Sequence, residues 1–366
     1  MFPDKVDKMV LDGVLKPREY IAGSDIQQTA STEAVLDGLI SGCVSRPDLC
    51  PIAIRPTDQK SLQVQIYDLF DSIDTGPYII DNTTSPPTIL DSKTLHAAVI
   101  APLYAPPLWP IPGDFFDAVE LRNVTKYSLL LPTLTGALRG PSVKPAIRCS
   151  DTSLHSTSPY PEPARISRAL LAQSPRLAGQ VTTAQTLLCP QWPFQTKGRY
   201  QGDFNVTTKN TTLFVGNIFD PITSLAAARN ESATFKGSGL LIQDGYGHTS
   251  TAQPSNCTTA AIAAYFVNGT LPVDGTIDHP FAFSYARLCT KPHEPALHPS
   301  SHTARYSTGR QKGGLHRDRL DGIIVVCSEP ALAKLLDCRW SGEVQAEKVI
   351  EPDDLVGVYG EEVVDG

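Results

Sequence analysis

Two residues in the stretch 212–250 have the types and positions of a catalytic acid and base. Asp220 follows the short apolar run 213–215, and His248 follows the run 240–242. A carboxylate can hold an imidazole in one tautomer and stabilise its charged form, which is the acid–base half of Ser–His–Asp chemistry. The structural alternatives are that Asp220 closes a turn before Pro221 and that His248 is only solvated in its Gly-rich loop.

The elements around these two residues form a strand–helix–strand unit. Both apolar runs are too short for a helix and end in turn residues, which indicates buried strands. Between them, Thr223 or Ser224 can cap a helix that 225–229 continue and that Gly237 ends. Two strands joined in this way are parallel. Their carboxyl ends then meet at the edge where open α/β sheets carry their chemistry.

Four separated stretches carry a family likeness: FPDKVDKMVLDGVL, FVGNIFDPITSLAAARN, LLIQDGYGHTS and PSNCTTAAIAAYFVNGTLP. They resemble the C-terminal part of the tripeptidyl aminopeptidase-like serine peptidases, which are secreted α/β-hydrolases that release short peptides or single residues from free N-termini. The likeness covers about residues 2–276. It implies that Asp220 is the triad acid and His248 the triad base, in the chain order of α/β-hydrolases. Asp12, beside the turn after the first motif, is a rival for the acid.

The nucleophile is the missing member of this triad. A nucleophile elbow needs G-x-S-x-G, because a strained strand-to-helix turn needs small neighbours. Four glycine pairs have this spacing, but their central residues are Ile40, Leu138, Tyr200 and Gln311. In the family the elbow lies shortly before the first matching stretch. We therefore expect an inactive fragment that begins after the nucleophile. The alternative is a decayed, non-catalytic paralogue that binds peptides or is vestigial.

The composition of the chain argues against several classes of partner. The net charge of −7 over 366 residues argues against nucleic acid and against an anionic membrane surface. No apolar run approaches the ~20 residues of a membrane helix. The sequence indicates no cofactor and no metal, because C-x-x-C is absent and His293, His298 and His302 lack carboxylates or thiolates at ligand spacing. A peptide substrate follows from the resemblance, and the oligomeric state stays open.

Two signals on cellular location conflict. Met1 is followed by Pro3 and by the charges of Asp4 and Lys5, without the apolar core of a signal peptide. Seven N-x-S/T sequons nevertheless suit a secretory chain, at Asn82, Asn123, Asn205, Asn210, Asn230, Asn256 and Asn268. The eight cysteines favour the same oxidising compartment. We expect an extracellular protein that has lost its N-terminus and signal, either by truncation of the sequence or by evolutionary loss.

The resemblance also implies the pairing of several cysteines. It matches Cys43 with Cys50, and Cys149 with Cys189, as two disulfides of the cap. Family members commonly carry a later cysteine in a G-T-x-C motif, where this chain has Asp278. Cys257 is therefore expected to be unpaired or joined only to the tail.

The expected fold is α/β, namely the last strands and helices of a parallel α/β-hydrolase sheet with a large inserted helical cap and an unassigned tail. The expected domains are core 1–15, cap 16–210, core 211–278 and tail 279–366. Strands 5–11, 213–215 and 240–242 should be adjacent and parallel beneath the cap. Helical stripes in the cap fall at 32–40, 61–73, 93–103, 115–121 and 165–171. The cap should read the substrate's N-terminus, with Trp109 and Trp192 either in its core or in the substrate wall.

Overall fold

The computed structural model describes residues 2–54, 58–136, 143–155, 161–194, 196–200, 202–273 and 275–278. The chain forms two compact units, residues 1–328 and 329–366, and every described residue belongs to the first. The expected tail 279–366, with its histidines at 293, 298 and 302, lies outside the described residues.

Within this part of the chain, parallel strands form one sheet in the order β1-β4-β5-β6. The strands are β1 (Val10–Asp12), β4 (Leu213–Phe219), β5 (Gly239–Tyr246) and β6 (Ile277–Asp278). The three expected strands are thus adjacent and parallel, which confirms that prediction. The first of them is shorter than the predicted 5–11, because Pro3–Lys5 forms a 3₁₀ turn and the Met9 N–H donates to the Tyr265 hydroxyl.

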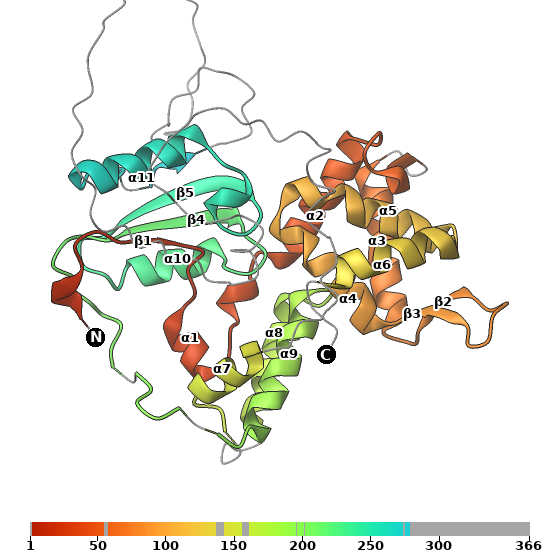
Figure 1. Cartoon of the computed structure of the whole chain (residues 1–366), viewed down its shortest axis with the longest axis horizontal. Helices are drawn as coiled ribbons and strands as arrows, with labels where there is room; N and C mark the ends of the chain where they lie inside the picture. The colour runs from red at the N-terminus through yellow and green to blue at the C-terminus, as the bar shows by residue number, and fades with distance from the viewer. Residues whose placement is uncertain are drawn as a thin grey trace, which may run out of the picture. The chain divides into compact units, whose positions relative to one another are not determined.

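Two helices cover opposite faces of this sheet. Figure 1 shows α11 (Asn256–Asn268) above the strands and α10 (Leu225–Ser232) below them. Side chains on β4 alternate between the faces: Leu213 and Val215 pack in a cluster with α11, and Phe214 packs in a cluster with α10. Burial on both faces explains why these strands appear in the sequence as continuous apolar runs.

The described residues between β1 and β4 are mostly helical. The helices are α1 (Pro17–Ala22), α2 (Thr32–Ser45), α3 (Gln59–Ile73), α4 (Ser92–Ile100), α5 (Pro110–Glu120), α6 (Val124–Gly136), α7 (Val143–Asp151), α8 (Pro161–Gln173) and α9 (Ala178–Leu188). Helices α2, α3, α4, α5 and α8 confirm the five expected stripes. The sequence patterns did not predict α1, α7 or α9, nor α6, which contains Pro132. They also did not predict the antiparallel hairpin of β2 (Tyr78–Asp81) and β3 (Thr88–Leu90).

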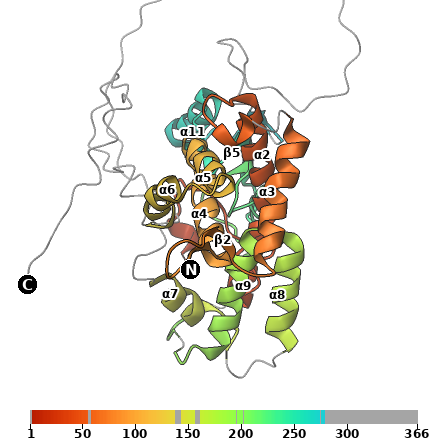
Figure 2. The ribbon, with the colours of Figure 1, turned by 90° about the vertical axis from the view of Figure 1, so that its right-hand side faces the viewer.

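The helices from α2 to α6 enclose one hydrophobic core that is separate from the two clusters of the sheet. Fully or almost fully buried side chains in it include Leu36, Ile66, Leu95, Phe115 and Tyr127. Figure 2 shows α8 and α9 side by side. In this view they lie below α2 and α5. Separate cores agree with a cap distinct from the sheet, while the exact limits of the two domains stay a prediction.

Two disulfides tie parts of the helical region together. Cys43 at the end of α2 bonds to Cys50, with their Cα atoms 5.1 Å apart. Cys149 of α7 bonds to Cys189 after α9, with a Cα separation of 4.7 Å. These are the two pairings that the family resemblance implies.

The cap packs against the carboxyl ends of the sheet strands. Phe219 and Tyr246, the last residues of β4 and β5, stack at 4.4 Å and pack against the helical core. Gly38 of α2 leaves room for the Tyr246 ring, since a Cβ there would lie 2.1 Å from it. The Thr32 hydroxyl donates to the Pro221 carbonyl at 2.6 Å. The edge of the sheet that carries Asp220 and His248 is therefore covered by helices.

Candidate active site

The structure brings the predicted acid and base into contact. Asp220 directly follows β4, and His248 lies two residues beyond the end of β5. The imidazole Nδ1 is 3.2 Å from Asp220 Oδ2 and 3.3 Å from Oδ1. Both side chains are buried, with exposed fractions of 1% for Asp220 and 7% for His248. Adjacent parallel strands place their ends side by side, which is why residues 28 positions apart meet.

Asp220 is also held by four other donors from its own loop and from the loop of His248. The backbone N–H groups of Ile222 and Thr223 donate to Oδ1 at 2.9 and 2.8 Å. The Thr223 hydroxyl and the Thr249 N–H donate to Oδ2 at 2.7 and 3.0 Å. Such donors fix the orientation of the carboxylate. Asp220 thus closes the turn and also meets the histidine.

The expected helix cap near Asp220 is wrong in detail. Ser224 occupies the capping position of α10, but its side chain makes no capping hydrogen bond. Its hydroxyl donates instead to the carbonyl of Gln27. The Thr223 hydroxyl donates to Asp220 Oδ2 and lies 3.1 Å from His248 Nδ1. Tertiary contacts at the site therefore replace the local cap that the sequence suggested.

Asp12, the rival acid, binds a different residue. It ends β1, and its carboxylate accepts the Ser250 N–H at 3.0 Å and the Ser250 hydroxyl at 2.7 Å. Burial raises the pKa of Asp12 from 3.8 to about 6, against the lowering effect of the Ser250 hydrogen bonds; the nearby charge of Asp220 raises it further. Asp12 anchors the loop after His248, and Asp220 is the carboxylate in contact with the imidazole.

Gly13 brings the end of β1 against the imidazole. Its φ of +72° lies in the left-handed region. A Cβ at this position would lie 3.2 Å from His248 Cε1 and 2.8 Å from Thr249 Cγ2. The sequence reading treated Asp12-Gly13 only as a turn, although a glycine at a strand end can also signal a close approach.

The two tryptophans have different surroundings. The Trp109 ring meets Tyr246 edge-on at 5.3 Å and packs against the helical core, next to the end of β5. Trp192 meets Phe194 at 6.4 Å, and its indole N–H donates to Ser150 Oγ at 3.2 Å. Of these two side chains, Trp109 therefore lies near the carboxyl end of β5, packed against the helical core.

Asp278 occupies the position where the resemblance leads one to expect a cysteine. Its carboxylate accepts the Thr258 N–H at 3.2 Å and the Thr258 hydroxyl at 2.7 Å, near the start of α11. Hydrogen bonds therefore link β6 to α11 at this point. Cys257 is itself disulfide-bonded, so the expectation that it is unpaired is wrong.

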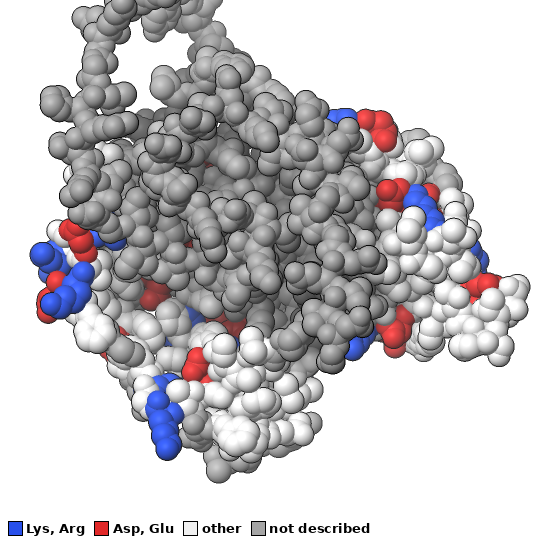
Figure 3. All heavy atoms as spheres, in the orientation of Figure 1, with Lys and Arg blue, Asp and Glu red and all other residues white. Residues whose placement is uncertain are grey.

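The described surface and helices can be compared with the expected glycosylation, partners and metal content. The asparagines of all seven sequons are exposed, which leaves glycosylation a prediction. Acidic and basic side chains are interspersed on the described part of the face in Figure 3. In the described ranges, no helix is long and apolar enough to cross a membrane. The same residues contain no group of three or more His, Cys, Asp or Glu side chains that could hold a metal ion.

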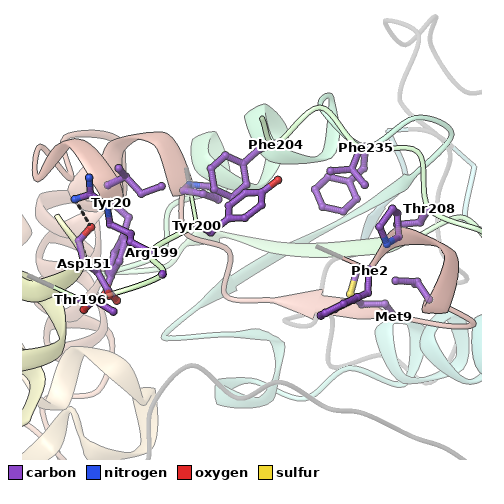
Figure 4. Close-up of a pocket in the computed structure, with 16 residues that line it drawn as sticks. Phe2, Met9, Tyr20, Asp151, Thr196, Arg199, Tyr200, Phe204, Thr208 and Phe235 are labelled. Atoms are coloured by element: carbon purple, nitrogen blue, oxygen red, sulfur yellow. Dashed lines mark hydrogen bonds between the residues drawn. The ribbon is translucent and has the colours of Figure 1, made fainter. Parts of the chain in front are cut away.

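A cavity of about 730 Å³ lies away from the catalytic pair. Figure 4 shows it between the segment before β1, α1, the 196–208 stretch and Phe235. Its walls are mainly apolar and include Phe2, Met9, Tyr200, Phe204 and Phe235. Neither Asp220 nor His248 lines it. The contacts of the pair are instead with the carboxyl ends of the strands and with the cap.

The site can be placed among known proteins by comparison. A family model described as TAP-like protein matches residues 174–277, a stretch that contains β4, α10, β5, α11, Asp220 and His248. Residues 174–277 are thus similar to the TAP-like α/β-hydrolases. Among curated relatives, the serine protease Hip1 of Mycobacterium tuberculosis and of Mycobacterium bovis is 22% identical over 299 residues. The match covers 75% of this chain and 53% of Hip1, so the chain spans about half the length of these curated relatives.

Proposed function

We propose that this chain carries the acid and base of a serine peptidase that cleaves short peptides or single residues from free N-termini. The observation that supports this most directly is the buried contact of His248 Nδ1 with Asp220 at the carboxyl edge of a parallel sheet. Asp220 would hold the Nδ1–H tautomer, which leaves Nε2 as the base that takes a proton from a serine hydroxyl. The serine protease Hip1 supports the same reaction class.

The nucleophile is not supplied by any G-x-S-x-G in the 366 residues. The hydroxyls next to the pair do not serve in its place: that of Thr223 donates to Asp220, that of Ser250 to Asp12, and that of Thr249 bonds to Thr251. We therefore infer that residues 1–366 alone are inactive. Without a nucleophile there is no route through an acyl-enzyme.

The test assays residues 1–366 against chromogenic aminoacyl and tripeptidyl substrates, beside the longer polypeptide obtained by reading the coding DNA upstream of the Met1 codon in frame. We expect no turnover by residues 1–366. If the longer chain adds G-x-S-x-G, it should hydrolyse the substrates, and His248→Ala should abolish that activity. Turnover by residues 1–366 that His248→Ala abolishes would overturn the assignment of the nucleophile.

The alternative proposal is a non-catalytic paralogue that binds peptides, which the missing elbow favours. It predicts no in-frame G-x-S-x-G upstream of the Met1 codon. It also predicts peptide binding by residues 1–366 that His248→Ala leaves unchanged, measured by titration calorimetry with a tripeptide. Binding that requires His248 would contradict it.

We further propose that the protein matures in the secretory pathway. The two described disulfides and the exposed sequon asparagines support this location. Expression in a eukaryotic secretory host should give a glycosylated product whose mass falls after treatment with a peptide N-glycosidase. A product of unmodified mass would contradict the glycosylation.

A further inference from the structure

A proline-rich joint between α4 and α5 lies against the loop that carries His248. The joint consists of two 3₁₀ turns, η4 (Pro102–Tyr104) and η5 (Pro106–Leu108). It is closed by its own hydrogen bonds, from Ala105 N to Pro102 O at 3.1 Å and from Leu108 N to Ala105 O at 2.9 Å. Proline fixes φ, so this segment has few conformations available.

The joint contacts the catalytic base through both its backbone and a side chain. The His248 N–H donates to the Tyr104 carbonyl at 2.8 Å. The Tyr104 ring meets the imidazole edge-on, with centroids 5.1 Å apart and an interplanar angle of 69°. The imidazole therefore has Asp220 on one side and the cap's Tyr104 on another, which restricts its rotation.

The residue before the histidine has no room for a side chain against this joint. Gly247 has φ of +98°. A Cβ there would lie 2.6 Å from the Tyr104 carbonyl oxygen and 2.9 Å from Pro106 Cδ. The close approach of the two backbones accounts for the glycine, because only glycine combines this φ with this spacing.

The loop of the acid is tied to the cap side as well. The Thr32 hydroxyl, at the start of α2, donates to the carbonyl of Pro221, the residue after Asp220. The Ser224 hydroxyl donates to the carbonyl of Gln27, in the turn before α2. Both loops of the catalytic pair thus take contacts from the segment between β1 and β4.

We propose that Tyr104 is a positioning residue for His248, which holds the imidazole in the orientation that faces Asp220. The cap then does more than shape access: its proline-rich joint completes the acid–base pair. The inference rests on the proposed role of His248 as the base. It goes beyond that role by naming the part of the cap on which the base depends.

The experiment measures the Nδ1 proton of His248 by NMR in the full chain labelled with ¹⁵N-histidine, with the signal assigned by its loss in His248→Asn. In the wild type, a slowly exchanging Nδ1–H is expected. In Tyr104→Leu the edge-on ring contact is lost, and exchange of this proton should become about 2- to 10-fold faster. Tyr104→Phe keeps the ring and should restore the wild-type rate.

The matched control is Tyr127→Leu, which removes a buried tyrosine from the core of the cap, where the Tyr127 ring packs on Phe115. It should lower the melting temperature and leave the His248 proton unchanged. The proposal is overturned if Tyr104→Leu exchanges at the wild-type rate, or if Tyr127→Leu accelerates exchange equally. A wild-type imidazole with no protected Nδ1–H would instead refute the proposed function, so the two failures are distinguishable.

Discussion

The carboxyl ends of β4 and β1 each place an aspartate beside the same loop, and the two aspartates differ in what surrounds them. Asp220 accepts four hydrogen bonds from three residues in addition to its contact with His248. Asp12 is bonded by the single residue Ser250, and its pKa is raised to about 6. Neighbouring strand ends thus carry the same residue type in two different electrostatic environments.

This difference shows that the hydrogen-bond donors around a carboxylate decide its role. Backbone N–H groups aimed at Asp220 replace the hydrogen bonds to water that burial removes, and they fix the orientation of the carboxylate toward the imidazole. Asp12 has fewer donors, and desolvation dominates. Both aspartates lie at the carboxyl edge of the sheet, so position alone makes each a candidate for the acid. The hydrogen-bond donors around each carboxylate distinguish them.

The largest effect should come from removing each carboxylate in turn. Asp220→Ala leaves buried donors and the imidazole without their acceptor, and we expect it to lower the free energy of unfolding at pH 7 by about 3–5 kcal/mol. Asp12→Ala should cost less than about 1 kcal/mol, because relief of the burial penalty offsets the lost Ser250 bonds. Urea unfolding measures both values. Equal losses would remove the contrast between the two strand ends.

The next effect is the pH dependence that Asp12 causes. Its pKa is 3.8 in the ordinary state and about 6 in the fold, so the folded protein binds more protons than the unfolded chain between these values. Stability from this group is fully present below pH ~4 and is lost as pH rises through ~6, by about 3 kcal/mol in total. Asp12→Asn should flatten this part of the curve of unfolding free energy against pH. An unchanged slope in Asp12→Asn would assign the dependence to other groups.

The smallest effect concerns the spacing between β1 and the imidazole. Gly13→Ala adds a Cβ near His248 Cε1 and Thr249 Cγ2 at a positive φ, whereas Gly269→Ala meets nothing within 4 Å at a similar φ of +77°. The control isolates the backbone penalty of about 1 kcal/mol. We expect Gly13→Ala to cost about 1–2 kcal/mol more, the usual range for overpacking. Similar melting temperatures for the two variants would show that the contact is easily relaxed.

Much of the sheet could be predicted because its signals are local. The runs at β4 and β5 are apolar on both faces, and a strand–helix–strand unit of this length permits one handedness and a parallel pairing. Asp220 and His248 follow the ends of these strands, so their proximity follows from the geometry. The helices of the cap that have a clear apolar stripe could be predicted from the sequence as well.

The sequence could not show the contacts that join distant segments. The Ser224 hydroxyl binds the Gln27 carbonyl instead of capping α10, and the Tyr104 carbonyl binds the His248 N–H across 144 positions of the chain. A backbone carbonyl carries no residue signature, so no pattern could nominate Tyr104. The distinction between Asp12 and Asp220 also depended on their donors, which are fixed only once the loops fold.

The most direct test of the account is the tautomer of His248 in Asp220→Asn and Asp12→Asn, measured by ¹⁵N NMR of the full chain. In Asp220→Asn the amide offers one acceptor oxygen to the four protein donors that bind the carboxylate. We therefore expect the Nδ1–H form to give way to the Nε2–H form, whereas Asp12→Asn should keep the Nδ1–H form of the wild type. Loss of the Nδ1–H form in Asp12→Asn, with its retention in Asp220→Asn, would make Asp12 the acid and contradict the assignment.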